Sequence, residues 1–471
     1  MYAAYSSWMR GGMGFACITH TMTESISSPT LKAYRAQLLR FDDAGRPVHD
    51  PDGLLVLERD TQGLWRVKAA GDAHALMQTC RDVTPVHWPD RMIAPGFVDM
   101  HVHYPQLDVI GSPADGLLPW LEHYTFPQET RFADPVHAQG VADAFLDELQ
   151  RHGVTTALTF ATSHPTSADA LFSRAKARGG RIITGLCLMD RHAPDALLNP
   201  VPPGSGRTVA EQSLLDSEAL LQRWHGQGRL GYAITPRFAP TCSDAQLGGA
   251  GELAAAHPGV WIQSHVAENR DEIAWVQSLY PQARSYLDVY HRFGLLRPRA
   301  VYAHCIHLDD TDRGLMRDTG TAAAVSPTSN LFLGSGFFDF AAAERSRHLH
   351  GLASDVGGGT SFSPFETMKA AYFVGRMALE QGGALKSGLS LAPSHLWWLH
   401  TDGAARGLGL GGQCGNLQPG CEADFVVLDP KATPLLARRT ASALSLDEWL
   451  FAFIILADDR AVAHVHLAEA R

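Results

Sequence analysis

Short apolar runs alternate with helix-like segments through the central part of this chain, and this alternation constrains the fold more than any other feature. Eight such runs occur, at 97–103, 155–162, 181–190, 230–240, 260–269, 300–308, 321–330 and 350–356. A run that is apolar on both of its faces is typical of a buried strand in a parallel sheet. Eight strand and helix units in succession predict an α/β fold built on a parallel barrel.

The segment that follows Asp134 is the clearest of the predicted helices. Asp134 is a good capping residue, and the proline after it is favoured at the first position of a helix. Val141, Phe145 and Leu149 then fall on one helical face, and Gly153 predicts the end of the helix. We therefore expect a helix between two of the barrel strands.

The two ends of the chain have a different pattern. In residues 31–94 and again in 415–471, short apolar runs are interrupted by turn residues, as in ADFVVL at 423–428. Both ends are therefore predicted to be β structure, with the barrel at 95–414 between them. Residues 1–30 are rich in Ser, Thr, Gly and Met and show no sustained period, so we expect a flexible N-terminal extension there.

Composition narrows the possible partners and the compartment. The net charge is −10, from 49 acidic against 39 basic side chains, and the basic residues are scattered, which disfavours nucleic acid and favours a small-molecule substrate. The seven cysteines form no Cys-x-x-Cys pair, which indicates reduced thiols in a cytoplasmic protein. No apolar stretch is long enough to span a membrane, and we expect no membrane partner.

The chain is unusually rich in histidine, with 23 residues. It contains three His-x-His pairs, namely His101 with His103, His348 with His350, and His464 with His466. A pair of this kind is expected by chance in so histidine-rich a chain, so the pairs alone identify no site. We interpret the second and third pairs as histidines on solvated edge strands.

The positions of the polar residues along the predicted strands identify the first pair as functional. The active site of a (β/α)8 barrel lies at the carboxyl ends of its strands, and His101 and His103 close the first predicted strand. Alternate strand residues point to the same face, so both imidazoles can bind one ion. His265, His304 and Asp355 close three other strands. Several nitrogen ligands with one carboxylate suit Zn²⁺ or Fe²⁺ better than Mg²⁺ or Ca²⁺.

Several motifs give the chain a family resemblance. PGFVDMHVHYPQ at 95–106 resembles the opening motif of the amidohydrolase superfamily, and its HYPQ extension resembles the guanine deaminases of that superfamily. The likeness continues through LPWLEHYTFPQE at 118–129, YAITPRFAPT at 232–241 and SPTSNLFLGSG at 326–336. It extends over almost the whole chain from about Leu31 onward.

The resemblance implies a deformed (β/α)8 TIM barrel whose two chain ends join into a small β-sandwich. It also implies one metal ion, Zn²⁺ or alternatively Fe²⁺, and a homodimer. The residues that it places at the metal are His101, His103, His265, His304 and Asp355. The residues that it places at a purine are Gln106, Arg237, Phe238 and Glu268, and we add Trp120 and Phe126 as candidate stacking faces.

The expected reaction is the hydrolytic deamination of guanine to xanthine and ammonia. A bound zinc ion lowers the pKa of its water to about 7. Asp355 is placed to accept a proton from that water, Glu268 to protonate a ring nitrogen and the departing amine, and His304 to polarise the attacked carbon. Another hydrolase of the superfamily, acting on a pterin, a triazine or a pyrimidine, is the alternative. A scaffold without catalytic activity is disfavoured because no ligand is missing.

Overall fold

The structure is a computed structural model that describes residues 30–80, 83–380 and 391–469. The extension predicted for residues 1–30 lies outside these ranges except for Thr30. The description below therefore concerns the part of the chain from Leu31 onward, which forms one compact unit.

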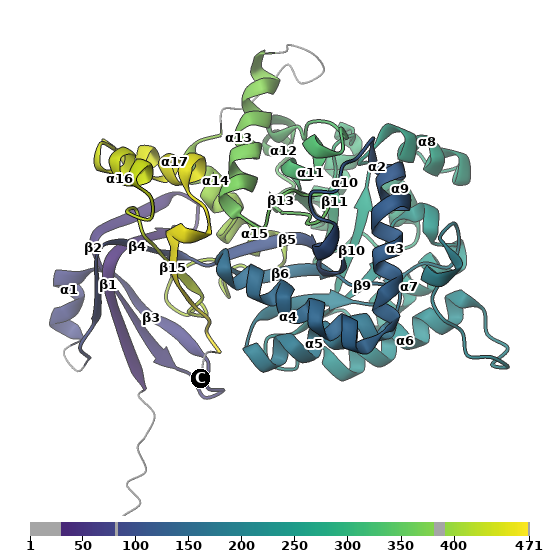
Figure 1. Cartoon of the computed structure of the whole chain (residues 1–471), viewed down its shortest axis with the longest axis horizontal. Helices are drawn as coiled ribbons and strands as arrows, with labels where there is room; N and C mark the ends of the chain where they lie inside the picture. Colours follow the sequence, from purple (N-terminus) through teal and green to yellow (C-terminus); the bar gives the residue numbers. More distant parts are fainter. Residues whose placement is uncertain (1–29, 81–82, 381–390, 470–471) are drawn as a thin grey trace, which may run out of the picture. The chain divides into compact units, whose positions relative to one another are not determined.

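A parallel barrel forms the centre of this unit (Figure 1). Its strands follow one another in space as β5 (Phe97–His103), β6 (Val154–Phe160), β7 (Arg181–Gly185), β9 (Gly231–Pro236), β10 (Trp261–Val266), β11 (Ala300–His304), β12 (Ala322–Val325) and β13 (Leu349–Leu352), with β8 (Cys187–Leu188) beside β9. All of these pairings are parallel. Just beyond β13, Asp355 N donates to His101 O at 2.9 Å, which connects the last strand to the first. The predicted barrel is confirmed.

Every predicted apolar run contains or overlaps an observed strand, but several runs extend beyond the end of their strand. The run at 321–330 forms strand β12 only as far as Val325. Pro327 then begins helix α11 (Pro327–Phe332), because proline fits the first turn of a helix and cannot donate to a ladder.

Helices surround the barrel strands. Those that connect or flank the strands are α4 (Pro135–Arg151), α5 (Pro165–Arg178), α6 (Val209–Trp224), α7 (Asp244–Ala256), α8 (Arg270–Leu279), α9 (Tyr286–Arg292), α10 (Asp310–Thr319), α12 (Phe340–Ser346), α13 (Pro364–Glu380), α14 (Pro393–Leu399) and α15 (Asp402–Gly407). Helix α4 has the predicted cap, since Asp134 accepts a hydrogen bond from Val136 N at 2.9 Å. Its predicted apolar face, Val141, Phe145 and Leu149, is buried.

The two ends of the chain meet in a six-stranded sheet of order β15-β14-β4-β1-β2-β3. Its strands are β1 (Leu31–Phe41), β2 (Pro47–Arg59), β3 (Trp65–Asp72), β4 (Val86–Pro95), β14 (Phe425–Leu428) and β15 (Val462–His466). The sheet curls, since Trp65 N of the edge strand β3 donates to Ala468 O at 2.8 Å and Val67 N to Cys421 O at 2.8 Å. An apolar cluster with Tyr34 and Phe425 fills its inner face.

The expectation that the chain ends hold only β structure is wrong at three helices. These are α1 (Ala73–Thr79), α16 (Pro434–Ala441) and α17 (Leu446–Leu456). Helix α17 contains the apolar run LFAFIIL, which resembles a buried strand in sequence. Ser445 caps this helix by accepting from Glu448 N, and α17 packs against α13 and α14 of the barrel. Residues 415–471 therefore cover part of the barrel as well as completing the sheet.

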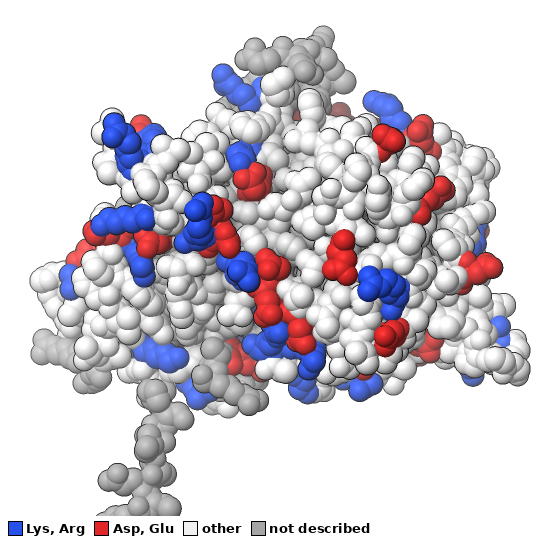
Figure 2. Space-filling view, in the orientation of Figure 1, with Lys and Arg blue, Asp and Glu red and all other residues white. Residues whose placement is uncertain are grey.

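Charged side chains of both signs are interspersed on the face drawn in Figure 2. Many of them are paired, as Arg178 is with Asp143 at 2.9 Å. Among the described residues, no helix has both the length and the apolar character needed to cross a membrane.

A buried ion network joins the amino-terminal end of the barrel to the sheet. Arg229 precedes β9 and donates from Nε to Glu422 Oε2 at 2.8 Å, and it also contacts Asp424. Arg181, at the start of β7, contacts Glu422 as well. The side chains of Arg229, Glu422 and Asp424 are 1%, 5% and 0% exposed, so each charge depends on its partners. This network lies at the end of the strands opposite to the predicted site.

We expect Glu422→Gln to lower the free energy of unfolding by about 3–5 kcal/mol, because it leaves two buried guanidinium groups with one carboxylate. Denaturant unfolding measures this loss, and kcat of the folded variant is expected to stay unchanged. The matched control is Glu58→Gln on the same sheet. Glu58 pairs with Lys68 at 3.1 Å with both side chains nearly half exposed, and its loss should cost less than about 1 kcal/mol. Equal effects of the two variants would contradict the structural role of the network.

Candidate active site

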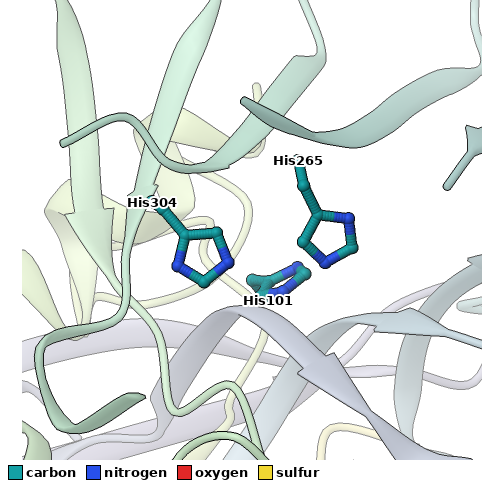
Figure 3. A group of neighbouring side chains, drawn as sticks. All are labelled: His101, His265 and His304. Atoms are coloured by element: carbon teal, nitrogen blue, oxygen red, sulfur yellow. The ribbon is translucent and has the colours of Figure 1, made fainter. Parts of the chain in front are cut away.

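The five predicted metal ligands meet at the carboxyl ends of the barrel strands. His101 and His103 lie on β5, His265 lies on β10, and His304 closes β11. The parallel register of β10 and β11 pairs Val266 with His304, which brings His265 and His304 to the same edge. Figure 3 shows the rings of His101, His265 and His304 facing one another. Only His265 is partly exposed.

The distances within this cluster fit a metal ion. His103 Nε2 lies 3.2 Å from His101 Nε2 and 3.1 Å from His265 Nε2. Two nitrogens bound to one ion at about 2.0–2.1 Å are about 3.0–3.4 Å apart, so these separations match a shared coordination sphere. His101 Nε2 also lies 2.9 Å from Asp355 Oδ1. The ligand atoms of His101, His265 and His304 all lie within 4.8 Å of one another.

Hydrogen bonds on the outer side of the rings orient two of the imidazoles. His265 Nδ1 donates to Arg237 O at 2.6 Å, and His304 Nδ1 donates to Asn330 Oδ1 at 2.9 Å. Each bond leaves the Nε2 lone pair of its ring facing the cluster, as metal-binding histidines require. The sequence analysis noted the run that contains Asn330 but assigned this residue no role.

Burial and neighbouring charges set the protonation of the cluster. Burial holds the pKa of His101 below the usual value, and those of His103 and His265 well below it, so these rings are in the neutral form that binds metals. Burial alone raises the pKa of Asp355, but the adjacent imidazoles outweigh it and hold that pKa below its usual range. Burial likewise lowers the pKa of His304, and the carboxylates of Glu268 and Asp355 more than compensate.

The backbone is strained at two of the candidate ligands, His304 and Asp355. His304 has φ +71° and Asp355 has φ +52°, in the left-handed region that side-chain-bearing residues adopt at a cost of about 1–2 kcal/mol. Asp99 on β5 holds the second turn, because Ser354 donates to its carboxylate from N at 3.0 Å and from Oγ at 2.5 Å. Strain of this kind is typical of functional sites.

A cavity opens beside the cluster, where convergent polar groups meet apolar walls, as in small-molecule sites. The predicted purine-contacting residues Gln106, Trp120, Arg237, Phe238 and Glu268 line it, together with His103, His265, His304 and Asp355. Phe126 is placed differently. Its ring faces the guanidinium of Arg237 at 5.3 Å and does not belong to the cavity lining.

Glu268 has the environment of a general acid and base. Its carboxyl is buried, Ser335 Oγ donates to its Oε1 at 3.2 Å, and its Oε2 lies 3.4 Å from His304 Nε2. Burial raises the pKa of Glu268 to about 7. Both the protonated and the ionised forms are therefore accessible near neutral pH, which suits proton transfer.

Glu129, which no sequence pattern identified, is fully buried next to two residues of the cavity lining. Arg237 donates to Glu129 from Nη1 at 2.5 Å and from Nη2 at 3.1 Å, and Gln106 Nε2 donates to it at 3.0 Å. A buried guanidinium requires an acidic partner, so Arg237 itself was a signal that such a residue exists. The separation of 108 positions along the chain left that partner unidentified.

The interpretation of the other histidine pairs as solvated is wrong for most of their members. His464 is exposed, but His348, His350 and His466 are buried. The ring of His466 stacks on Phe425 at 4.7 Å because β15 packs against β14 within the curled sheet. None of these four histidines belongs to the cavity lining or to the ligand clusters found among the described residues.

Comparison with known proteins places this site in a family. The Amidohydrolase family matches residues 92–468. Guanine deaminase of Escherichia coli (strain K12) is 40% identical over 93% of this chain and 97% of its own length. The crystal structure of guanine deaminase from Bradyrhizobium japonicum superposes with a TM-score of 0.87 at 32% identity, covering 94% of this chain and 98% of that one. That of guanine deaminase from C. acetobutylicum, with bound guanine in the active site, gives a TM-score of 0.83 at 27% identity, covering 93% and 99%.

This chain therefore belongs to the amidohydrolase family, whose enzymes are metal-dependent. Within that family it groups with the guanine deaminases, which are hydrolytic enzymes. The family resemblance predicted from the motifs is confirmed.

We expect His101→Ala and His265→Ala to lose most of the bound metal and most of the activity, because removal of one imidazole opens the coordination set. Metal content per chain, measured by elemental analysis, tests this expectation. The matched control is His464→Ala, which removes an exposed imidazole on β15 and should change neither quantity. A ligand variant that retains about one tightly bound ion per chain and normal turnover would contradict the assignment.

Proposed function

We propose that this enzyme hydrolyses guanine to xanthine and ammonia in the cavity between the histidine cluster and Arg237. The observation that carries the proposal is that this one buried cavity combines the ligand cluster, an acid and base at Glu268, and donor groups from Arg237 and Gln106. The membership of the chain among the guanine deaminases supports the same substrate.

His101, His103, His265, His304 and Asp355 would hold one metal ion, Zn²⁺ in the first place and Fe²⁺ as the alternative. The neutral imidazoles of His101, His103 and His265 and the ionised carboxylate of Asp355 fit such an ion. When bound, it lowers the pKa of a coordinated water to about 7, which supplies a nucleophile at neutral pH.

The carboxylates move the protons. Asp355 accepts the proton of the attacking water as the water adds to C2 of the purine. Glu268 protonates a ring nitrogen, takes up the proton of the hydroxyl now on C2 as the carbonyl forms, and passes it to the departing amine, so that ammonia leaves as a neutral molecule and the proton held by Asp355 restores Glu268. His304 polarises the attacked carbon. Its Nε2 lies 3.4 Å from Glu268 Oε2 and 3.8 Å from Asp355 Oδ2, between the two carboxyl groups.

The remaining lining residues orient the purine. Arg237 is a donor-only group in a fixed fork and therefore favours a ring carbonyl, which guanine carries at C6. Gln106 hydrogen-bonds the same edge of the purine ring. Phe238 and Trp120 supply the apolar faces of the cavity. Phe126 supports this arrangement from behind, through the face that it presents to Arg237.

We also propose a homodimer in the cytoplasm and a division of the chain into a catalytic barrel at 95–414 and a β domain at 31–94 and 415–471. The six cysteines in the described residues are all free, which supports a reducing compartment. The resemblance to the guanine deaminases is the ground for the dimer.

Glu268→Gln is expected to retain its metal while turnover of guanine falls by roughly 10²- to 10⁴-fold, because the amide cannot exchange a proton. Metal analysis and steady-state ammonia release on the same sample measure the two effects. Glu252→Gln, which alters an exposed carboxyl on α7, serves as the control and should leave turnover unchanged. Loss of metal from Glu268→Gln would make Glu268 a ligand and would rule out the proposed proton relay.

A comparison of substrates tests both the proposed reaction and the proposed role of Arg237. Ammonia release should be efficient from guanine and weak or absent from adenine and cytosine, since a buried donor without a partner can reject an analogue by up to about 10⁴-fold. Arg237→Ala should lose guanine turnover with its metal content unchanged. Comparable kcat/KM for adenine and guanine would refute the assignment, and release from a pterin, a triazine or a pyrimidine alone would favour another hydrolase of the family.

A further inference from the structure

Glu129 is not part of the cavity lining, but it contacts Gln106 and Arg237, two lining residues that face the purine in the proposed function. Its Oε1 accepts from Gln106 Nε2 at 3.0 Å and from Arg237 Nη2 at 3.1 Å, and its Oε2 accepts from Arg237 Nη1 at 2.5 Å. The side chains of all three residues are buried. One carboxylate therefore holds two separate groups of the cavity wall in a single arrangement.

These hydrogen bonds determine which hydrogen-bonding groups of Arg237 and Gln106 remain for a ligand. A guanidinium has five N–H donors and no acceptor, and Arg237 uses two of them on Glu129 and also contacts the Cys187 thiol, so every group that it has left is a donor. Gln106 has two N–H donors and one oxygen, and one donor goes to Glu129. Its oxygen accepts from Gly357 N at 3.2 Å, so the group left over on its nitrogen is a donor as well.

We propose that Glu129 is the positioning residue that determines specificity for a 6-oxopurine, by turning Gln106 and Arg237 into a wall that presents donors only. This inference rests on the proposed function, in which these two side chains face the purine. A ring edge with acceptors, such as the edge of guanine that carries the 6-oxo group, satisfies such a wall. A ring edge with hydrogen or an amine at C6 leaves a buried donor without a partner.

The amide of a glutamine at position 129 cannot do the same work. It offers one oxygen and one NH2 group. Because Arg237 donates to both oxygens of Glu129, the NH2 group faces an Arg237 donor in either orientation, and in one of them it faces Gln106 as well. One of the two wall residues has to turn away. We expect the change to stay local, because the Phe126 ring, which faces the guanidinium at 5.3 Å, still packs against Arg237.

The experiment compares kcat/KM for guanine and for 2-aminopurine, which has hydrogen in place of the 6-oxo group and no proton on N1, in the wild-type holoenzyme and in Glu129→Gln. We expect guanine turnover to fall on the order of 10²-fold, as for a misplaced binding group, while 2-aminopurine changes far less and the metal content stays the same. The ratio of the two kcat/KM values is the decisive readout, since a general structural defect lowers both substrates together. If 2-aminopurine reacts too slowly, its inhibition constant against guanine gives the same comparison.

Two further variants complete the design. Glu122→Gln makes the same substitution at an exposed position seven residues earlier and should leave the ratio unchanged. In an Arg237→Ala background, Glu129→Gln should lower the ratio little further, because most of its effect passes through Arg237. Full additivity of the two substitutions would overturn the proposal.

If Glu129→Gln alone fails to fold, a double variant tests the same role. Glu129→Gln combined with Arg237→Gln removes both buried charges together, and such paired replacement is far better tolerated than loss of one partner. Discrimination should be lost in this folded double variant. A preserved ratio in either variant, or an equal loss for both substrates, overturns the role of Glu129. A wild-type enzyme that releases no ammonia from guanine would instead refute the proposed function.

Discussion

Several imidazole nitrogens and one carboxylate point at a single buried position, and this convergence is the constraint on which the rest of the structure depends. His103 Nε2 lies within 3.2 Å of the Nε2 atoms of both His101 and His265, and lone pairs at that distance repel unless a proton or a cation lies between them. The barrel holds these side chains in that arrangement. Its parallel strands end at one rim, and strained turns at His304 and Asp355 direct the last two ligands inward.

One residue, Arg237, contacts the histidine cluster and also lines the cavity. The backbone carbonyl of Arg237, at the end of β9, accepts from the ring of His265 at 2.6 Å. The side chain of the same residue faces the cavity and rests on Glu129. A shift of β9 would therefore disturb the ligand cluster and the purine-binding wall together. This coupling is one physical reason for the extensive buried hydrogen bonding around the site.

The barrel could be predicted, and a set of candidate ligands proposed, because both follow from local patterns. Apolar runs mark buried strands, and polar residues that close such runs mark the catalytic rim, which was enough to select His101 and His265 from 23 histidines. Helix α17 was missed because an apolar run of its length is ambiguous between a strand and a buried helix, and only packing against α13 and α14 decides between them.

The parts of the site that escaped prediction are those fixed by contacts between distant segments. Glu129 and Arg237 are 108 positions apart, and nothing in either local sequence names the other. Asn330 orients His304 across a separation of 26 positions. His350 is buried beside Phe338, at a ring separation of 6.1 Å, and near Glu344, and the pattern of β13 reveals neither neighbour.

The central claim is that these five side chains hold a catalytic metal ion next to a purine. A crystal structure of the active enzyme with xanthine, measured at the zinc and iron absorption edges, tests it most directly. The account predicts one anomalous peak about 2.0–2.2 Å from the His101, His103 and His265 Nε2 atoms, with C2 of the purine facing it and its oxo edge on Arg237. Crystals of active enzyme without a peak at this position, or with xanthine bound elsewhere, would contradict the account.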